Sequence, residues 1–116
     1  MIRAGSIVIV HLINPNEKLW GLLQEIGVAG VFLRGINVVT FDDWMVQASR
    51  KGEQSLGLVT MFVPLFRVER IFLDEAVGEV ESYRQRFRRQ VGVDVERYLG
   101  VTDGAAELED SSEVPS

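Results

Sequence analysis

The sequence predicts a mainly β fold with five short strands, a short helix between the third and fourth strands, and an amphipathic helix near the C-terminus. Three observations lead to this fold class. Apolar and β-branched runs of strand length recur through the first 73 residues, and most of them end at Gly, Pro or Asn. Two later segments change to helical spacing. The 116 residues are enough for one domain with one modest core.

The first strand is expected at residues 6–13 (SIVIVHLI), a run too short and too β-branched to favour a helix. Both of its faces are apolar, because Val8 and Val10 alternate with Ile7 and Ile9. An antiparallel sheet with one solvated face shows a cleaner alternation. The second face therefore needs a cover, which a helix, the curvature of a barrel or another subunit could provide.

Turn-forming residues separate the next strands. Pro15 stands between two asparagines, a pattern typical of a chain reversal. We expect the second strand at residues 18–26 and the third at residues 31–36, because Gly27 and Gly30 interrupt the apolar run between them.

Residues 40–51 change to helical spacing. Thr40, with Asp43 three residues later, is a weaker form of a capping box, and Gly52 follows the basic end of the segment. A short helix is expected here, and its apolar stripe consists of Phe41, Trp44, Met45 and Ala48.

The chain then returns to strand. We expect the fourth strand at residues 56–63, ending at Pro64. Residues 65–68 should form a tight turn or one 3₁₀ turn, and residues 70–73 the fifth strand.

An amphipathic helix is expected at residues 77–91, where Gly92 ends a stripe spaced by three or four residues. The stripe consists of Val77, Val80, Tyr83, Phe87 and Val91, and four arginines lie mostly off it: Arg84, Arg86, Arg88 and Arg89. Residues 101–116 carry five acidic side chains and no basic or aromatic one, so we expect a disordered acidic tail. That tail accounts for the whole net charge of −5.

Five short strands with a 3₁₀-like turn before the last one suggest a small SH3-like barrel. On the second strand, Gly21, Leu23 and Ile26, followed by VFL at residues 31–33, resemble the first motif of the Sm-like (LSm) family, which includes a bacterial RNA-chaperone branch. The resemblance covers residues 6–74 and implies a divergent member that forms rings, in which the fourth strand of one subunit pairs with the fifth of the next. We expect three segments: the barrel at residues 1–75, a helical extension at residues 76–100 and the acidic tail at residues 101–116.

The departures from the family pattern concern nucleotide contacts. Gly27 stands where the family places a polar or acidic residue, and Gly30 stands where many members place Asn. The second motif usually supplies a base-contacting side chain, for which Arg67 is the single candidate. The resemblance therefore implies the family's fold more strongly than its RNA-binding chemistry.

The composition offers little for catalysis or metal binding. The chain has no Cys and one His, so thiolate sites are excluded and His11 has no second imidazole beside it. We interpret His11 as structural, and Asp42 and Asp43 as capping acids, because adjacent helix residues do not share a face. No phosphate-loop, dinucleotide, zincin or hydrolase motif occurs, so we expect neither enzyme activity nor a cofactor.

The leading hypothesis is a non-catalytic, self-assembling Sm-like barrel that serves as a protein-interaction or scaffold module. Its partners would be copies of itself and a protein that the sequence does not identify. The candidate interface residues are Trp20, Phe62, Phe66 and Phe72. Core packing is an equal alternative for Trp20 and is expected for Trp44.

The alternative is a ring that binds RNA weakly through basic side chains. Its candidate contacts are Arg67, Arg84, Arg86, Arg88 and Arg89. A small enzyme or ligand-binding barrel is a third hypothesis, which rests on the carboxylates alone. No apolar run has the length of a membrane span and no signal peptide is visible, so we expect a cytoplasmic protein without membrane contact.

Overall fold

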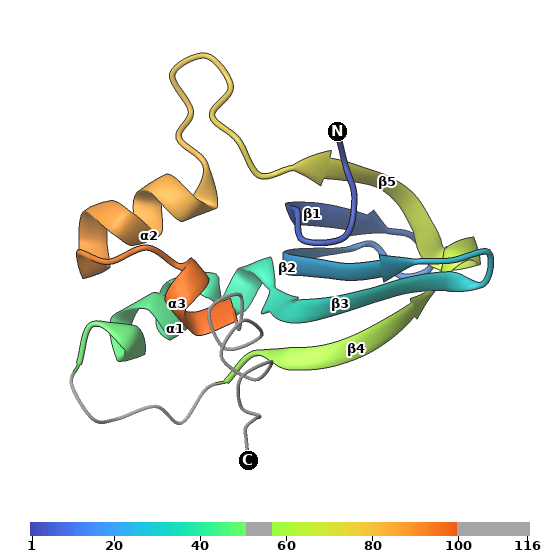
Figure 1. Ribbon diagram of the computed structural model, residues 1–116, viewed down its shortest axis with the longest axis horizontal. Helices are drawn as coiled ribbons and strands as arrows, with labels where there is room; N and C mark the ends of the chain where they lie inside the picture. The colour runs from blue at the N-terminus through green and yellow to red at the C-terminus, as the bar shows by residue number, and fades with distance from the viewer. Residues whose placement is uncertain (51–56, 100–116) are drawn as a thin grey trace, which may run out of the picture.

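The computed structural model describes residues 1–50 and 57–99 of the chain. Its centre is one antiparallel sheet of five strands in the order β4-β3-β2-β1-β5 (Figure 1). The strands are β1 (Ile7–Leu12), β2 (Glu17–Ile26), β3 (Gly30–Asn37), β4 (Val59–Pro64) and β5 (Val68–Leu73). The mainly β class and the five predicted strands are confirmed.

The described helices lie between β3 and β4, between β4 and β5, and after β5. They are η1 (Val38–Thr40), α1 (Phe41–Ala48), η2 (Leu65–Arg67), α2 (Tyr83–Val91) and α3 (Glu96–Leu99), where η marks a 3₁₀ helix. Of the two alternatives predicted for residues 65–68, a tight turn or one 3₁₀ turn, the structure has the 3₁₀ turn, η2. Helices α1, α2 and α3 gather at one end of the sheet, and η2 lies at the opposite end beside the turn between β2 and β3 (Figure 1).

Local irregularities interrupt the regular pairing. A bulge lies between Leu23 and Glu25 of β2, and the register with β5 shifts between His11 and Leu12 of β1. Bulges bend a strand and increase its twist. The sheet nevertheless stays open, because β4 and β5 are its two edges. The barrel prediction is confirmed only as far as a five-stranded antiparallel sheet.

Two glycines face each other across β2 and β3. Gly21 is paired with Gly35, and a Cβ atom on Gly21 would lie 2.3 Å from the carbonyl oxygen of Arg34. A Cβ atom on Gly35 would lie 2.0 Å from the carbonyl oxygen of Trp20. Only residues without a side chain permit this close approach of the two strands.

Both apolar faces of β1 are covered within one chain. The inner cluster packs on one face of the sheet and consists of Val8, Val10, Leu12, Leu19, Leu23, Val31, Leu33 and Val63. The helix-side cluster joins the other face to the helices and consists of Ile7, Trp20, Leu22, Ile36, Phe41, Trp44, Met45, Phe87, Val95 and Leu99. No second subunit is required to bury β1, so its two apolar faces are not by themselves evidence for self-assembly.

Helix α1 lies within its predicted segment but begins with a different cap. The side chain of Thr40 makes no cap hydrogen bond to α1; its Oγ1 donates to the carbonyl oxygen of Asn37 at 2.8 Å. The side-chain oxygen of Asn37 accepts from the backbone N–H of Val39 at 3.0 Å and caps η1. The capping box predicted at Thr40 is therefore wrong, because the preceding 3₁₀ turn provides the first cap.

Helix α2 is shorter than predicted, because its cap lies further along the chain. The hydroxyl of Ser82 accepts from the backbone N–H of Gln85 at 3.0 Å, and the side chain of Gln85 accepts from the backbone N–H of Ser82 at 2.8 Å. This reciprocal capping box starts the helix at Tyr83 rather than at residue 77.

The residues predicted for the first turn of this helix form a small projection instead. Val77 and Val80 make an isolated antiparallel bridge around Gly78, whose φ of 60° is left-handed. A left-handed residue ends helical geometry, and glycine adopts it without steric cost. The projection is visible between β5 and α2 (Figure 1).

Some predictions fall on residues 51–56 and 100–116, outside the described part of the chain. They are the end of the middle helix, the start of the fourth strand and the acidic tail. No helix among the described residues is long and apolar enough to cross a membrane.

Candidate functional site

The free edge of β4 presents backbone groups that no strand of the sheet pairs. The N–H of Leu65 donates to the carbonyl oxygen of Ala29 at 2.9 Å, at the end of the ladder between β3 and β4. Hydrogen-bonding direction alternates along an antiparallel strand, so the N–H groups of Thr60 and Phe62 point away from β3. Pro64 occupies the next outward position on the same strand, so the N–H that proline lacks would not have bonded to β3.

The free edge of β5 is organised in the same way. The N–H of Asp74 donates to the carbonyl oxygen of Ile7 at 2.9 Å, just beyond the end of β5. The same alternation therefore directs the backbone N–H and C=O groups of Ile71 and Leu73 away from β1. Unpaired strand edges favour pairing with another strand.

Each edge also carries an exposed aromatic side chain. Phe62 on β4 is 45% exposed, and its ring lies 5.1 Å from the ring of Phe32. Phe72 on β5 is 42% exposed and meets the ring of His11 edge-on at 4.8 Å. The guanidinium of Arg70 lies 6.0 Å from the Phe72 ring.

The aliphatic side chains that alternate with these aromatics are incompletely buried. Met61 on β4, and Ile71 and Leu73 on β5, pack at the rim of the inner cluster and stay partly accessible. Each edge thus combines a protruding phenylalanine with aliphatic side chains that lack a full cover.

Two segments at the end of the sheet opposite the helices contain no polar side chain. We call this region the apolar tip; it consists of residues 26–33 (IGVAGVFL) and residues 62–66 (FVPLF). Val28 is 97% exposed and Phe66 is 81% exposed. Single exposed apolar residues are common, but a cluster of them marks a contact surface.

Trp20 lies in the core and offers no surface to a partner. It is fully buried in the helix-side cluster, where its ring lies 5.0 Å from that of Phe41 and 5.8 Å from that of Trp44. The interface prediction for Trp20 is therefore corrected to core packing, which is also what the structure shows for Trp44.

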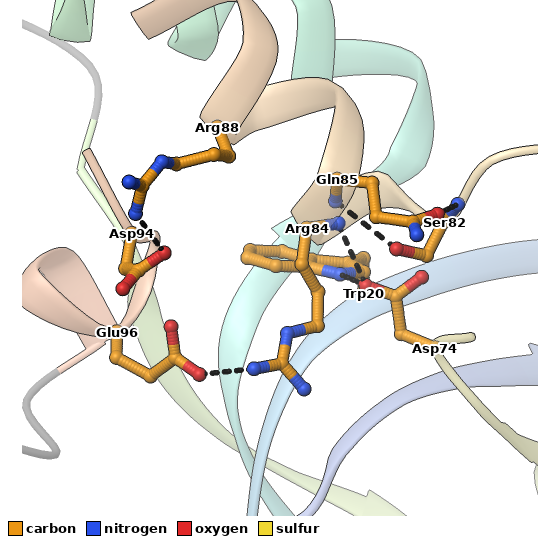
Figure 2. Close-up of polar contacts among 8 residues, drawn as sticks. All are labelled: Trp20, Asp74, Ser82, Arg84, Gln85, Arg88, Asp94 and Glu96. Carbon is orange, nitrogen blue, oxygen red and sulfur yellow. Dashed lines mark hydrogen bonds and ion pairs between the residues drawn. The ribbon is translucent and has the colours of Figure 1, made fainter. Parts of the chain in front are cut away.

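Asp74 is a buried carboxylate that joins the sheet to α2. It accepts hydrogen bonds from the indole N–H of Trp20 and the backbone N–H of Arg84, both at 3.0 Å (Figure 2). The backbone N–H of Tyr83 donates to its other oxygen at 2.8 Å. Both of its oxygens are thus engaged by protein donors. The geometry assigns Asp74 a structural role at the start of α2.

The four arginines of α2 are engaged in ion pairs with acids from other segments. The pairs are Arg84 with Glu96, Arg86 with Asp42, Arg88 with Asp94 and Arg89 with Glu81. Two of these pairs are drawn in Figure 2. The arginines therefore connect α2 to α1, to the loop before α2 and to the segment around α3.

Arg67 holds the turn between β1 and β2. Its Nε donates to the carbonyl oxygen of Ile13 at 3.0 Å, and its Nη2 donates to that of Pro15 at 2.7 Å. The carboxylate of Glu17 lies 3.7 Å from the same Nη2. Most of the hydrogen-bonding capacity of the Arg67 guanidinium is therefore used within the chain, although the RNA hypothesis requires this group to contact RNA.

His11 lines a cavity of about 390 Å³ together with Glu17, Lys18 and Glu69. Partial burial lowers the pKa of His11 below its ordinary value of 6.5, and the positive charges of Lys18 and Arg70 lower it further. In residues 1–50 and 57–99, no group of three or more His, Cys, Asp or Glu side chains could hold a metal ion.

Comparison with known proteins identifies no relative. No protein-family model matches the chain, and neither a curated protein nor a solved structure matches it.

Proposed function

We propose that this chain is a non-catalytic, self-assembling interaction module, in which β4 of one copy pairs with β5 of the next. The observation that carries the proposal is that β4 and β5, six residues each, are the sheet edges and present backbone groups that no strand among residues 1–50 and 57–99 pairs. Because the two edges differ, the contact is head-to-tail, and such contacts generate rings or filaments.

The outward backbone groups select an antiparallel register. Hydrogen-bonded pairs can form only between the outward residues of β4 and those of β5. One register uses all four outward residues: it opposes Thr60 with Leu73 and Phe62 with Ile71. The same register opposes Met61 with Phe72 as a non-hydrogen-bonded pair. Each protruding phenylalanine then covers an incompletely buried aliphatic side chain of the other copy, which supports this register.

We further propose that the sheet is a divergent Sm-like barrel. In that family the fourth strand pairs with the fifth strand of the neighbour, and here these strands are the two edges. The 3₁₀ helix before the last strand, the bulges and the close contact of Gly21 with Gly35 support a barrel-like bend. A cytoplasmic location belongs to the same proposal.

RNA binding has less support than self-assembly. The helix arginines are paired with acids, Arg67 is held by the turn between β1 and β2, and the apolar tip contains no side chain that could donate to a base. We therefore keep it as the second candidate.

A proline on the free edge of β4 tests the pairing. Thr60→Pro removes an outward N–H and leaves the ladder with β3 intact, whereas the matched Thr60→Val keeps the N–H. We expect light scattering to give the oligomer for the wild type and Thr60→Val, and 13.0 kDa for Thr60→Pro. A wild-type mass of 13.0 kDa at micromolar concentration would refute the proposal.

A mixture of two blocked variants tests the head-to-tail arrangement. Ile71→Pro removes an outward N–H of β5, with Ile71→Val as its control. Each proline variant retains one usable edge, so each alone should be monomeric while an equimolar mixture should give dimers. Circular dichroism verifies that both variants are folded. A mixture of folded variants that stays monomeric would exclude pairing between β4 and β5.

A further inference from the structure

The 3₁₀ helix η2 joins the two edge strands. β4 runs toward η2, and β5 runs away from it. When β4 pairs antiparallel with β5 of the next copy, the η2 ends of both strands lie at the same end of the junction. A parallel pairing would place them at opposite ends. The strand directions therefore determine where the apolar tips of neighbouring copies lie.

We infer that the apolar tips of successive copies pack against one another and form a continuous apolar collar along one side of the assembly. The inference rests on the proposed function, because the tips meet only where β4 and β5 pair. The register that opposes Phe62 with Ile71 places Pro64, at the η2 end of β4, across from Glu69, near the η2 end of β5 of the next copy. Paired strands lie about 5 Å apart, so the η2 turns of the two copies, each of which carries Phe66, are neighbours.

The apolar character of the tip fits the tip of another copy as its partner. Leu65 and Phe66 in η2 are 46% and 81% exposed, and Val28 in the adjoining turn is 97% exposed. The tip has no side chain that can donate or accept a hydrogen bond, and the guanidinium of the neighbouring Arg67 is directed to carbonyl oxygens of the turn between β1 and β2. An apolar surface of another copy is thus the complementary partner.

Each tip would touch two others. Through β4 a copy meets the tip of one neighbour, and through β5 it meets the tip of the other. Burial of apolar surface at the tips therefore adds to the backbone bonds of every junction. The tip contact also favours the antiparallel junction over the parallel one, because only the antiparallel junction brings the tips together.

Photo-cross-linking tests the contact directly. The photoreactive p-benzoylphenylalanine replaces Phe66 in the full chain and keeps an aromatic ring at the tip; the control carries it at Val39, which is 80% exposed and lies in η1. Isotope-labelled and unlabelled copies are mixed, so that mass spectrometry separates cross-links between copies from those within one. We expect cross-links between copies from position 66 to residues 26–33 or 62–66, and none to this region from position 39.

A disulfide test runs in parallel and reports on the strand edges alone. The natural chain has no cysteine, so Met61→Cys and Phe72→Cys can be mixed without background. The proposed register opposes these positions in a non-hydrogen-bonded pair, where Cβ atoms are closest. A mixed disulfide dimer therefore shows that the edges pair.

The two tests separate the two proposals. A disulfide dimer with tip cross-links supports both. A disulfide dimer without tip cross-links overturns the collar and leaves the edge pairing standing. A monomer that forms no disulfide dimer overturns the edge pairing, and the collar with it.

A pair of serine substitutions measures the strength of the tip contact. Phe66→Ser should weaken self-association about tenfold or more, because a buried phenylalanine ring is lost from every junction. Val39→Ser removes a comparably exposed apolar side chain outside the tip and should leave the association constant unchanged. Equal effects of the two substitutions would contradict the collar.

Discussion

The indole N–H of Trp20 donates a hydrogen bond of 3.0 Å to the carboxylate of Asp74, which lies 54 residues further along the chain. Trp20 belongs to the second strand and Asp74 follows the last one, and the same carboxylate accepts two backbone N–H groups at the start of α2. One buried acid thus fixes the helical segment to the sheet.

Removal of this acid should be among the most damaging single changes in the chain. Asp74→Ala leaves three buried or half-buried donors without their acceptor, and each such donor costs about 1–3 kcal/mol. We expect a loss of about 3 kcal/mol or more in urea unfolding. Ser82→Ala removes only the neighbouring cap and should cost about 1 kcal/mol. Similar losses for both variants would refute the central role of Asp74.

Gly21→Ala should destabilise the sheet strongly. Its Cβ would approach two backbone atoms, the carbonyl oxygen of Arg34 at 2.3 Å and the Cα of Gly35 at 2.7 Å, and backbone cannot move aside as a flexible side chain can. We expect a loss at or above about 3 kcal/mol in thermal or urea unfolding. Gly27→Ala is the control, because its Cβ would meet its nearest neighbour at 4.0 Å and should be tolerated.

Phe87→Ala should cost about 3–5 kcal/mol. Phe87 is fully buried between Trp44, at 5.1 Å, and Tyr98, at 5.5 Å, so its removal leaves a cavity in the helix-side cluster. Val80→Ala, on the exposed projection before α2, should change the free energy of unfolding by less than about 0.5 kcal/mol. A small loss for Phe87→Ala would mean that α2 contributes little to the fold.

His11 should make stability depend on pH below about 6.5. Its pKa is lowered in the folded state, so the unfolded chain binds the proton more tightly. Stability should therefore fall as the pH drops below about 6.5 and level off below the folded pKa. His11 is the single histidine, so an NMR titration reports its pKa without ambiguity. His11→Gln should remove this component, and a pKa above 6.5 would contradict the assignment.

Any RNA binding should be weak, insensitive to sequence and strongly dependent on salt. The helix arginines are already paired with acids, and phosphate contacts release counterions. A variant in which the four helix arginines are replaced by Gln should lose any RNA binding, as measured by fluorescence anisotropy at several salt concentrations. The replaced residues are Arg84, Arg86, Arg88 and Arg89. Tight binding of one oligonucleotide over scrambled controls at physiological salt would make RNA recognition the leading function.

The strands were predictable because their signals are local. The β-branched run of β1, the prolines at residues 15 and 64, and Gly27 with Gly30 place the strands to within a few residues. The start of α2 was missed although Ser82 and Gln85 have the spacing of a capping box. The apolar spacing of the preceding valines suggested an earlier start.

The candidate site was predictable only in part, because it depends on contacts between distant segments. Phe62, Phe66 and Phe72 are exposed as an interface requires, but nothing local separates them from Trp20, which is buried by helices that follow it. Asp74 resembles a turn residue in the sequence, and its three donors come from residues 9, 10 and 54 positions away. Which N–H groups of the edge strands point outward can be determined only when the pairing register of the whole sheet is known.

The difference between the two edges governs how an assembly would grow. The β4 edge is uncharged and ends at Pro64, whereas β5 carries Glu69 and Arg70. Each added copy brings one β4 edge and one β5 edge, and each new junction covers one edge of each kind. An open row of any length therefore keeps one free β4 edge and one free β5 edge. Closure is the only event that removes both ends. If the row closes into a ring, a dilution series should show single copies and complete rings with few species of intermediate size, whereas a row that stays open should give a broad range of sizes.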